Sequence, residues 1–122
     1  MSVTVKNIIQ EIEKIAPKTS ACNWDNVGLV CGSLSNTVDK IYFCLELDEF
    51  VVEDILNSGS DLVILHHSPM FFPYKNLTDD NLIGVLLMKL IHAGISVYCA
   101  HTNWDNSPIG VNKQLAEILK IQ

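Results

Sequence analysis

Short apolar runs alternate with amphipathic segments from residue 41 to the end of the chain, and this alternation limits the possible folds more than any other feature. Three runs have the length and composition of buried strands: 41–47, 62–65 and 95–100. The segments between and after them have helical spacing or helix-end signals, at about 50–56, 82–92 and 110–119. Strands that are apolar on both faces and separated by helices are typical of a parallel sheet covered by helices. The sequence therefore predicts an α/β fold with a mostly parallel sheet flanked by helices.

Two elements precede this alternation. Apolar residues from Val5 to Ile15 recur at helical spacing between charged residues, which predicts an amphipathic helix over 5–16, ended by Pro17. A short strand is expected over 27–31, before the turn-rich segment 32–39. A length of 122 residues with no linker or low-complexity tract corresponds to one domain over 1–122. The tripeptide Trp-Asp-Asn occurs at 24 and at 104, and we interpret this repeat as coincidence because nothing around it repeats.

The composition argues against several function classes. Hydrophobic residues make up 48% of the chain and charged residues 18%, which is enough to fill a core and argues against disorder. The basic residues are all lysines, and with 14 acidic residues they leave a net charge of −6, so no nucleic-acid partner is expected. No apolar run approaches the ~20 residues that cross a bilayer, so we expect a soluble protein with no membrane partner.

The cysteines indicate a reducing compartment. Cys22, Cys31, Cys44 and Cys99 form no CxxC pair, and the chain begins with charged residues where a signal peptide needs an apolar segment. We therefore expect a cytoplasmic protein. The last three of these cysteines lie inside apolar runs, which is typical of buried thiols rather than of a zinc cluster.

Histidines and one aspartate follow two of the predicted strands. His66 and His67 come directly after 62–65, whereas His101 and Asp105 follow 95–100. The carboxyl ends of neighbouring parallel strands meet at one edge of a sheet, so we expect these side chains to lie close together. Imidazole and carboxylate together suit zinc, manganese or iron. Adjacent histidines on a regular strand face opposite ways, so the pair favours a loop or two neighbouring ions, with Asp105 as a bridging or terminal ligand.

Two alternatives stay open for these residues. The histidines could simply begin a surface loop, and Asp105 could cap the last helix or its loop. Two ions would also need about six ligand contacts, and the chain offers only four good candidates, so a second chain or further residues would have to complete the centre. His92, in the middle of a Leu-rich helical segment, is interpreted as structural and lies outside the predicted site.

Four segments in order resemble one known family. They are WDNVGLVCG at 24–32, LELD at 45–48, DLVILHHSPMFF at 61–72 and AHTNWDNSPIGVNKQLAEIL at 100–119. Together they resemble the NIF-three-like family, whose members are also described as dinuclear metal-binding GTP cyclohydrolase I type 2 homologues. The similarity extends over nearly the whole chain, and the HH motif followed by HTN-x-D is far more specific than either motif alone.

The resemblance implies a NIF-three-like fold, two divalent metal ions in the complete site and a ring-like homo-oligomer, commonly a hexamer. By motif position, His66 and His67 would each bind a different ion and Asp105 would also be a ligand. His101 would be a ligand or a group beside the reacting water, and Asp25 would shape the entrance to the site. Typical members are considerably longer, and their carboxyl-terminal half supplies a further His and Glu to the metals. This chain therefore resembles the metal-binding N-terminal half.

Two functions follow from this reading. The first is a metal-dependent hydrolase acting on a small phosphorylated or nucleotide-like substrate, in which His101 is the catalytic residue that carries a proton, because an unperturbed imidazole titrates near neutrality. The second is a non-catalytic metal-binding or protein-interaction module, or a fragment that lacks the second half of the site.

Overall fold

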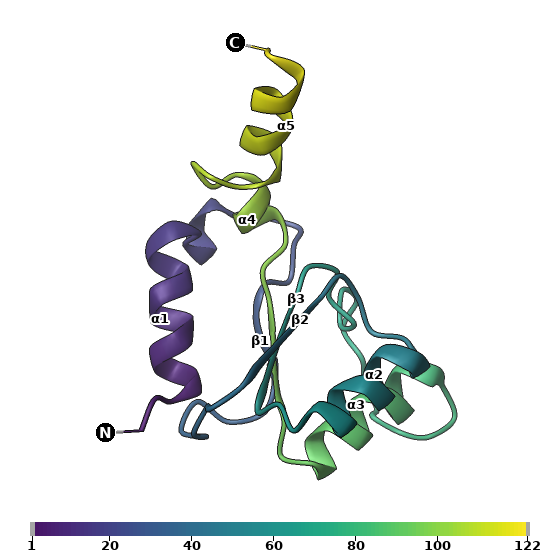
Figure 1. The fold of residues 1–122 in the computed structure, drawn as a ribbon. Coiled ribbons are helices and arrows are strands. Elements are labelled where there is room, and N and C mark those ends of the chain that lie inside the picture. The colour runs from purple at the N-terminus through teal and green to yellow at the C-terminus, as the bar shows by residue number, and fades with distance from the viewer. Residues whose placement is uncertain (1, 122) are drawn as a thin grey trace.

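The computed structural model describes residues 2–121 and is built on a four-stranded sheet (Figure 1). The strands are β1 (Gly28–Cys31), β2 (Ile41–Cys44), β3 (Leu62–Leu65) and β4 (Ser96–Cys99), and they lie in the order β1-β4-β3-β2. The last three are parallel, whereas β1 pairs with β4 in the antiparallel direction. The predicted α/β fold with a mostly parallel sheet is confirmed.

Helices cover the two faces of this sheet. The crossover helices α2 (Glu49–Ser58) and α3 (Leu82–His92) pack together on one face, and α1 (Val5–Ile15) lies on the other side of the sheet (Figure 1). Side chains of β3 alternate between these layers: Val63 and Leu65 pack with α2 and α3, and Leu62 packs with α1. Among the described residues, no helix is both long and apolar enough to cross a membrane.

Polar side chains at the helix starts explain where the helices begin. Thr4 and Asn7 form a capping box at α1, and the carboxylate of Asp48 accepts a hydrogen bond from the Val51 N–H at α2. At α3 the cap is Asn81, whose side chain accepts a hydrogen bond from the Gly84 N–H. The predicted positions of all three helices are confirmed, with shifts of one or two residues at their ends.

The strand expected over 41–47 is shorter than predicted, because the chain leaves the sheet after Cys44. The carbonyl of Leu45 then accepts hydrogen bonds from the backbone N–H groups of both His66 and His67, at 3.1 and 2.8 Å. These two bonds take the place of further ladder pairing. They hold the loop after β2 against the loop after β3.

The segment after β4 contains an additional short helix that the sequence did not indicate. Helix α4 (Thr102–Asp105) comes before α5 (Val111–Leu119), and a 3₁₀ turn at Lys18–Ser20 follows α1. In Figure 1, α5 extends away from the sheet, and none of its residues is buried. Helix α4 ends at Asp105, whose side chain lies beside that of His66, the first residue after β3.

The core behind α3 gives a direct test of this packing. Replacing the fully buried Leu90 (Leu90→Ala) should lower the free energy of unfolding by about 2–5 kcal/mol, because it leaves a cavity between α3 and the sheet. Ile91→Ala, at the next position of the same helix, is the matched control, since that side chain is 44% exposed and should cost less than about 1 kcal/mol. Urea unfolding followed by circular dichroism measures both. Equal losses of unfolding free energy in the two variants would contradict the packing of Leu90 against the sheet.

Candidate metal centre

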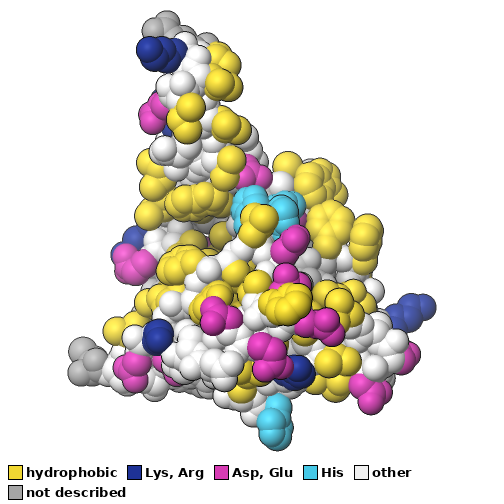
Figure 2. Space-filling view, turned by 45° about the vertical axis from the view of Figure 1, so that its right-hand side comes forward, with side chains coloured by type: hydrophobic (Ala, Val, Ile, Leu, Met, Phe, Trp, Pro, Cys, Tyr) yellow, Lys and Arg dark blue, Asp and Glu magenta, His cyan; other side chains and the backbone are white. Residues whose placement is uncertain are grey.

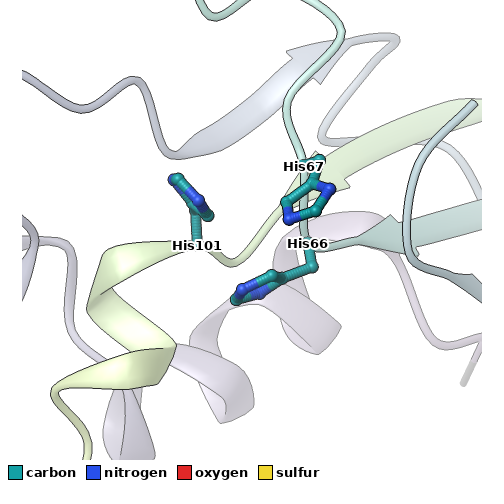
Figure 3. Close-up of side chains that lie close together, drawn as sticks. All are labelled: His66, His67 and His101. Atoms are coloured by element: carbon teal, nitrogen blue, oxygen red, sulfur yellow. The ribbon is translucent and has the colours of Figure 1, made fainter. Parts of the chain in front are cut away.

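The ends of β3 and β4 bring three histidines together. His66 and His67 follow β3 directly, and His101 lies two residues beyond the end of β4, which pairs with β3 in register. One ring nitrogen of each histidine lies within 4.8 Å of one from each of the others. Figure 3 shows the three rings around a common space. The prediction that both loops open at the same edge of the sheet is confirmed, and the cluster could hold a metal ion.

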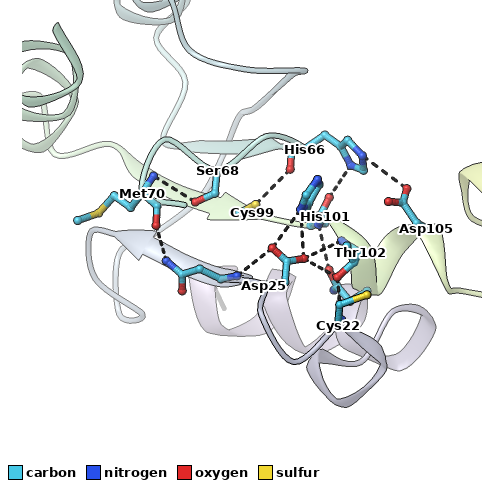
Figure 4. Close-up of polar contacts among 12 residues, drawn as sticks. Cys22, Asp25, His66, Ser68, Met70, Cys99, His101, Thr102 and Asp105 are labelled. Carbon is cyan, nitrogen blue, oxygen red and sulfur yellow. Dashed lines mark hydrogen bonds and ion pairs between the residues drawn. The ribbon is translucent and has the colours of Figure 1, made fainter. Parts of the chain in front are cut away.

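Asp105 lies beside this cluster. Its Oδ1 atom is 3.5 Å from Nε2 of His66, and both side chains are partly buried (Figure 4). The alternative that Asp105 caps the last helix is wrong, because α5 begins after Gly110, with no side-chain cap. The ligand roles of His66, His67 and Asp105 and the catalytic role of His101 stay predictions, but the fold places all four side chains at one site.

Asp25 holds His101 from behind. The Nδ1 atom of His101 lies 3.0 and 3.1 Å from the two carboxylate oxygens of Asp25, whose side chain is fully buried (Figure 4). The same carboxylate accepts hydrogen bonds from the Thr102 N–H and hydroxyl and from the Asn26 N–H. Burial by itself would raise the pKa of Asp25, but the hydrogen bonds from Thr102, His101 and Asn26 outweigh it and lower the pKa below the ordinary value. Asp25 is therefore a carboxylate anion that supports the cluster.

Glu46 is a site residue that sequence reasoning did not select. Its Oε2 atom lies 3.1 Å from Nδ1 of His67, because the Leu45 carbonyl binds the backbone at His66 and His67. The only sequence signal was its position near the end of the strand run that starts at Ile41, at the same edge of the sheet. A loop carboxylate that contacts only water would give the same signal.

Asn103 is a second residue that was not singled out, although it lies inside the HTN-x-D motif. Its side chain is fully buried, donates from Nδ2 to the carbonyl of Ala16 at 2.8 Å, and accepts at Oδ1 from the His101 N–H at 3.0 Å. It thereby joins the end of α1 to the backbone of a cluster histidine. This motif residue positions the site without facing it.

Aromatic side chains form one border of the cluster. Trp24 lies with its ring centroid 5.8 Å from that of Phe71 and 6.3 Å from that of His101, and Trp24 is 62% exposed. Asn26 donates to the Met70 carbonyl at 2.7 Å, which ties the loop after β3 to the segment that carries Trp24. In the space-filling view, hydrophobic side chains lie on both sides of the central group of histidines, and acidic side chains lie next to it (Figure 2).

An apolar groove of about 480 Å³ reaches the cluster from the other side. It runs between α1 and the edge strand β2 and ends at His66. Its apolar lining includes Ile8, Ile12, Ile15, Phe43, Ile64 and Trp104. A ligand at the histidines would therefore meet an apolar wall on this side.

The remaining histidine and the cysteines lie outside the cluster. His92 is exposed at the end of α3, away from the sheet edge that carries the other three. Cys99 is buried and donates to the His66 carbonyl at 3.3 Å, and burial raises its pKa to about 12. A thiol that stays protonated is a poor metal ligand, and no cysteine of residues 2–121 belongs to the group that could hold an ion.

Comparison with known proteins gives one family. The model of the family Duf34/NIF3 (NGG1p interacting factor 3) matches residues 3–122. A Clostridium perfringens protein named "GTP cyclohydrolase 1 type 2 homolog" is 37% identical over 115 residues, which cover 94% of this chain and 44% of the relative. The crystal structure of a Bacillus cereus protein related to NIF3 matches with a TM-score of 0.91 and 35% identity, over 99% of this chain and 34% of that one. Reduced HcgD from Methanocaldococcus jannaschii matches with a TM-score of 0.91 and 32% identity, over 100% of this chain and 49% of that one.

The contacts of Asn103 give a prediction about the stability of the site. Asn103→Ala should lower the free energy of unfolding by about 1–3 kcal/mol, because it leaves the buried Ala16 carbonyl and His101 N–H without their partner. Asn106→Ala removes a comparable bond to the Ser20 carbonyl at an exposed position and should cost less than about 1 kcal/mol. Urea unfolding of both variants measures the difference. If Asn103→Ala lowered the free energy of unfolding less than Asn106→Ala, the two buried hydrogen bonds of Asn103 would not contribute to stability as predicted.

Proposed function

The chain belongs to the Duf34/NIF3 family, and we propose that it binds divalent metal ions at His66, His67 and Asp105 and serves the hydrolysis of a small phosphorylated or nucleotide-like substrate. The observation that carries this proposal is the convergence of three imidazoles on one space, with the carboxylate of Asp105 beside them. Nitrogen and oxygen donors of this kind suit zinc, manganese or iron.

The chemistry of the side chains around the cluster fits a metal centre. Each of the three histidines offers a ring nitrogen to the common space. Cys44 and Cys99, which pair with Leu65 on either side of β3, have raised pKa values and remain protonated. His66 and His67 are consecutive residues in a bend rather than in a strand, so both can face one centre. Two neighbouring ions per complete site are part of the proposal.

Each side chain has a role in this proposal. A bound divalent ion would lower the pKa of its water and polarise a phosphoryl or acyl oxygen. His66, His67 and Asp105 hold the metal, and His101 accepts or returns a proton at its free ring nitrogen. A substrate at the cluster would contact the exposed ring of Trp24 on one side and the apolar groove on the other.

The second candidate function is a metal-binding module without catalysis. The chain spans 44% of the length of the Clostridium perfringens relative and 32% of that of a Bacillus subtilis relative of the same name. The cluster and Asp105 supply four side chains, whereas two ions need about six ligand contacts. This shortage favours a site that is completed by additional residues or by another chain.

Metal binding is the first test. The wild-type protein should bind Zn²⁺ in competition with a chromogenic chelator, and His66→Ala should weaken the affinity by more than about 100-fold, because losing a ligand costs more than losing its hydrogen-bond partner. His92→Ala is the matched control and should leave the affinity unchanged, since that side chain is exposed and away from the cluster. A wild-type protein without zinc affinity, or equal losses in the two variants, would contradict the proposed site.

Turnover separates the two functions. GTP is the probe, since the relatives are named for it, and metal-loaded wild-type protein should convert it to products resolved by chromatography. His101→Ala should keep its metal and lose about 10²–10⁴-fold in rate, as expected for removal of a general acid–base. Metal binding with no turnover of GTP or of other nucleotides would favour the module.

We also propose that the chain assembles with copies of itself. Three apolar side chains of α5 are half-exposed or more: Leu115 (50%), Ile118 (73%) and Leu119 (62%). This helix extends away from the sheet and contacts little beyond α4 (Figure 1). Exposed apolar surface of this kind marks an association site, and a ring of six copies is the arrangement that the family resemblance implies.

The free thiols support the proposed cytoplasmic location.

Light scattering after size exclusion tests the assembly. The wild-type mass should be at least twice the chain mass of 13.6 kDa. The double variant Ile118→Glu/Leu119→Glu should have a mass closer to that of the monomer, because burying the added charges in an apolar interface requires their desolvation. Asn112→Glu/Gln114→Glu adds the same charge to exposed polar positions of α5 and should keep the wild-type mass. A monomeric wild-type protein would refute self-assembly.

A further inference from the structure

In each of the three cluster histidines the same ring atom, Nδ1, lies within hydrogen-bond distance of an oxygen atom. Nδ1 of His66 lies 2.8 Å from the Ala100 carbonyl oxygen, Nδ1 of His67 lies 3.1 Å from Glu46 Oε2, and Nδ1 of His101 lies 3.0 Å from Asp25 Oδ1. A carbonyl oxygen and an ionised carboxylate only accept hydrogen bonds. Each Nδ1 must therefore carry a proton, so that the neutral form of each ring is the one with its lone pair on Nε2.

We propose that Asp25 and Glu46 are positioning residues that hold His101 and His67 in the Nδ1–H tautomer, so that Nε2 of His67 is the atom offered to a metal ion and Nε2 of His101 is the atom that exchanges a proton. The Ala100 carbonyl does the same for His66. This inference rests on the proposed metal-binding function. It adds two residues whose effect on metal binding or on proton transfer passes through the rings that they hold.

The two carboxylates hold their rings with different firmness. Asp25 is fully buried and is itself fixed by donors from Thr102 and Asn26, so it has little freedom to release His101. Glu46 has a side chain that is 64% exposed, and its position depends on the backbone bonds of the neighbouring Leu45. The ring of His101 is therefore held in place more rigidly than the ring of His67.

The structure around Asp25 also explains why a carboxylate is needed there. Its two oxygens face three kinds of donor: the imidazole N–H of His101, two backbone N–H groups and the Thr102 hydroxyl. An amide at this position would turn an NH₂ group toward some of these donors. Only a group that accepts at both ends satisfies all of them.

The tautomer is measured directly in the metal-free protein by ¹⁵N NMR of the imidazole rings. Wild-type His66, His67 and His101 should all show protonated Nδ1 and unprotonated Nε2. In Glu46→Ala the His67 ring should lose this preference, whereas His101 should keep it. A wild-type protein with Nε2–H rings at His67 and His101 would overturn the proposal.

Metal affinity is the second measurement, again by competition for Zn²⁺ with a chelator. Removing a group that orients a metal-binding histidine costs about 10–100-fold in affinity, so Glu46→Ala should fall near the lower end of this range, whereas Asp25→Asn should leave the zinc affinity unchanged because it acts on His101. Glu53→Ala is the matched control for Glu46→Ala, because Glu53 is a similarly exposed glutamate paired with Lys89. The effect of Asp25→Asn is measured instead on the His101 tautomer, with Asp61→Asn as the control, since Asp61 accepts from two backbone N–H groups far from the cluster.

The outcomes separate this inference from the proposed function. Tautomers that respond as described in a protein that binds no zinc would support the positioning roles and refute the metal site. Zinc binding that is unchanged in Glu46→Ala, together with an unchanged His67 tautomer, would refute the positioning role and leave the metal site standing. If Asp25→Asn does not fold, the Glu46→Ala measurements decide the proposal by themselves.

Discussion

The parallel pairing of β3 with β4 is the constraint on which the site depends. Its register sets Leu65 opposite Cys99, so the residues that follow each strand emerge at the same level. The Ala100 N–H continues the pairing to the Leu65 carbonyl, and the Ala100 carbonyl then accepts from the His66 ring. A shift of the register by one residue would turn the side chains of one strand to the opposite face and separate the histidines.

Support for the cluster comes from parts of the chain that carry none of its histidines. The segment after α1 supplies Asp25, and the loop after β2 supplies Glu46. Asn103 links the end of α1 to the backbone of His101. The candidate ligands thus lie on the short loop after β3 and on the short helix α4. Hydrogen bonds tie both segments to other parts of the chain, and a metal site needs rigidity of this kind.

The repeated Trp-Asp-Asn tripeptide shows the limit of reading motifs in isolation. From the sequence alone we interpret the repeat as coincidence. In the structure, however, both aspartates lie at the histidine cluster, Asp25 against His101 and Asp105 beside His66. The two carboxylates have different surroundings, since that of Asp25 is fully buried and that of Asp105 is partly exposed. The tripeptides are 80 residues apart, and only the packing of the chain gives them a common neighbourhood.

The sequence by itself determined the elements that local physics controls: the buried strands, the amphipathic α1, the order of strands and helices, and the histidines at the strand ends. These follow from residue spacing and helix-end signals, which act over a few positions. The tertiary structure alone decided the antiparallel β1, the short helix α4 and the carboxylates that hold His67 and His101. Those features depend on contacts between residues far apart in the chain, and a hydrogen bond across 76 positions leaves no local pattern in the sequence.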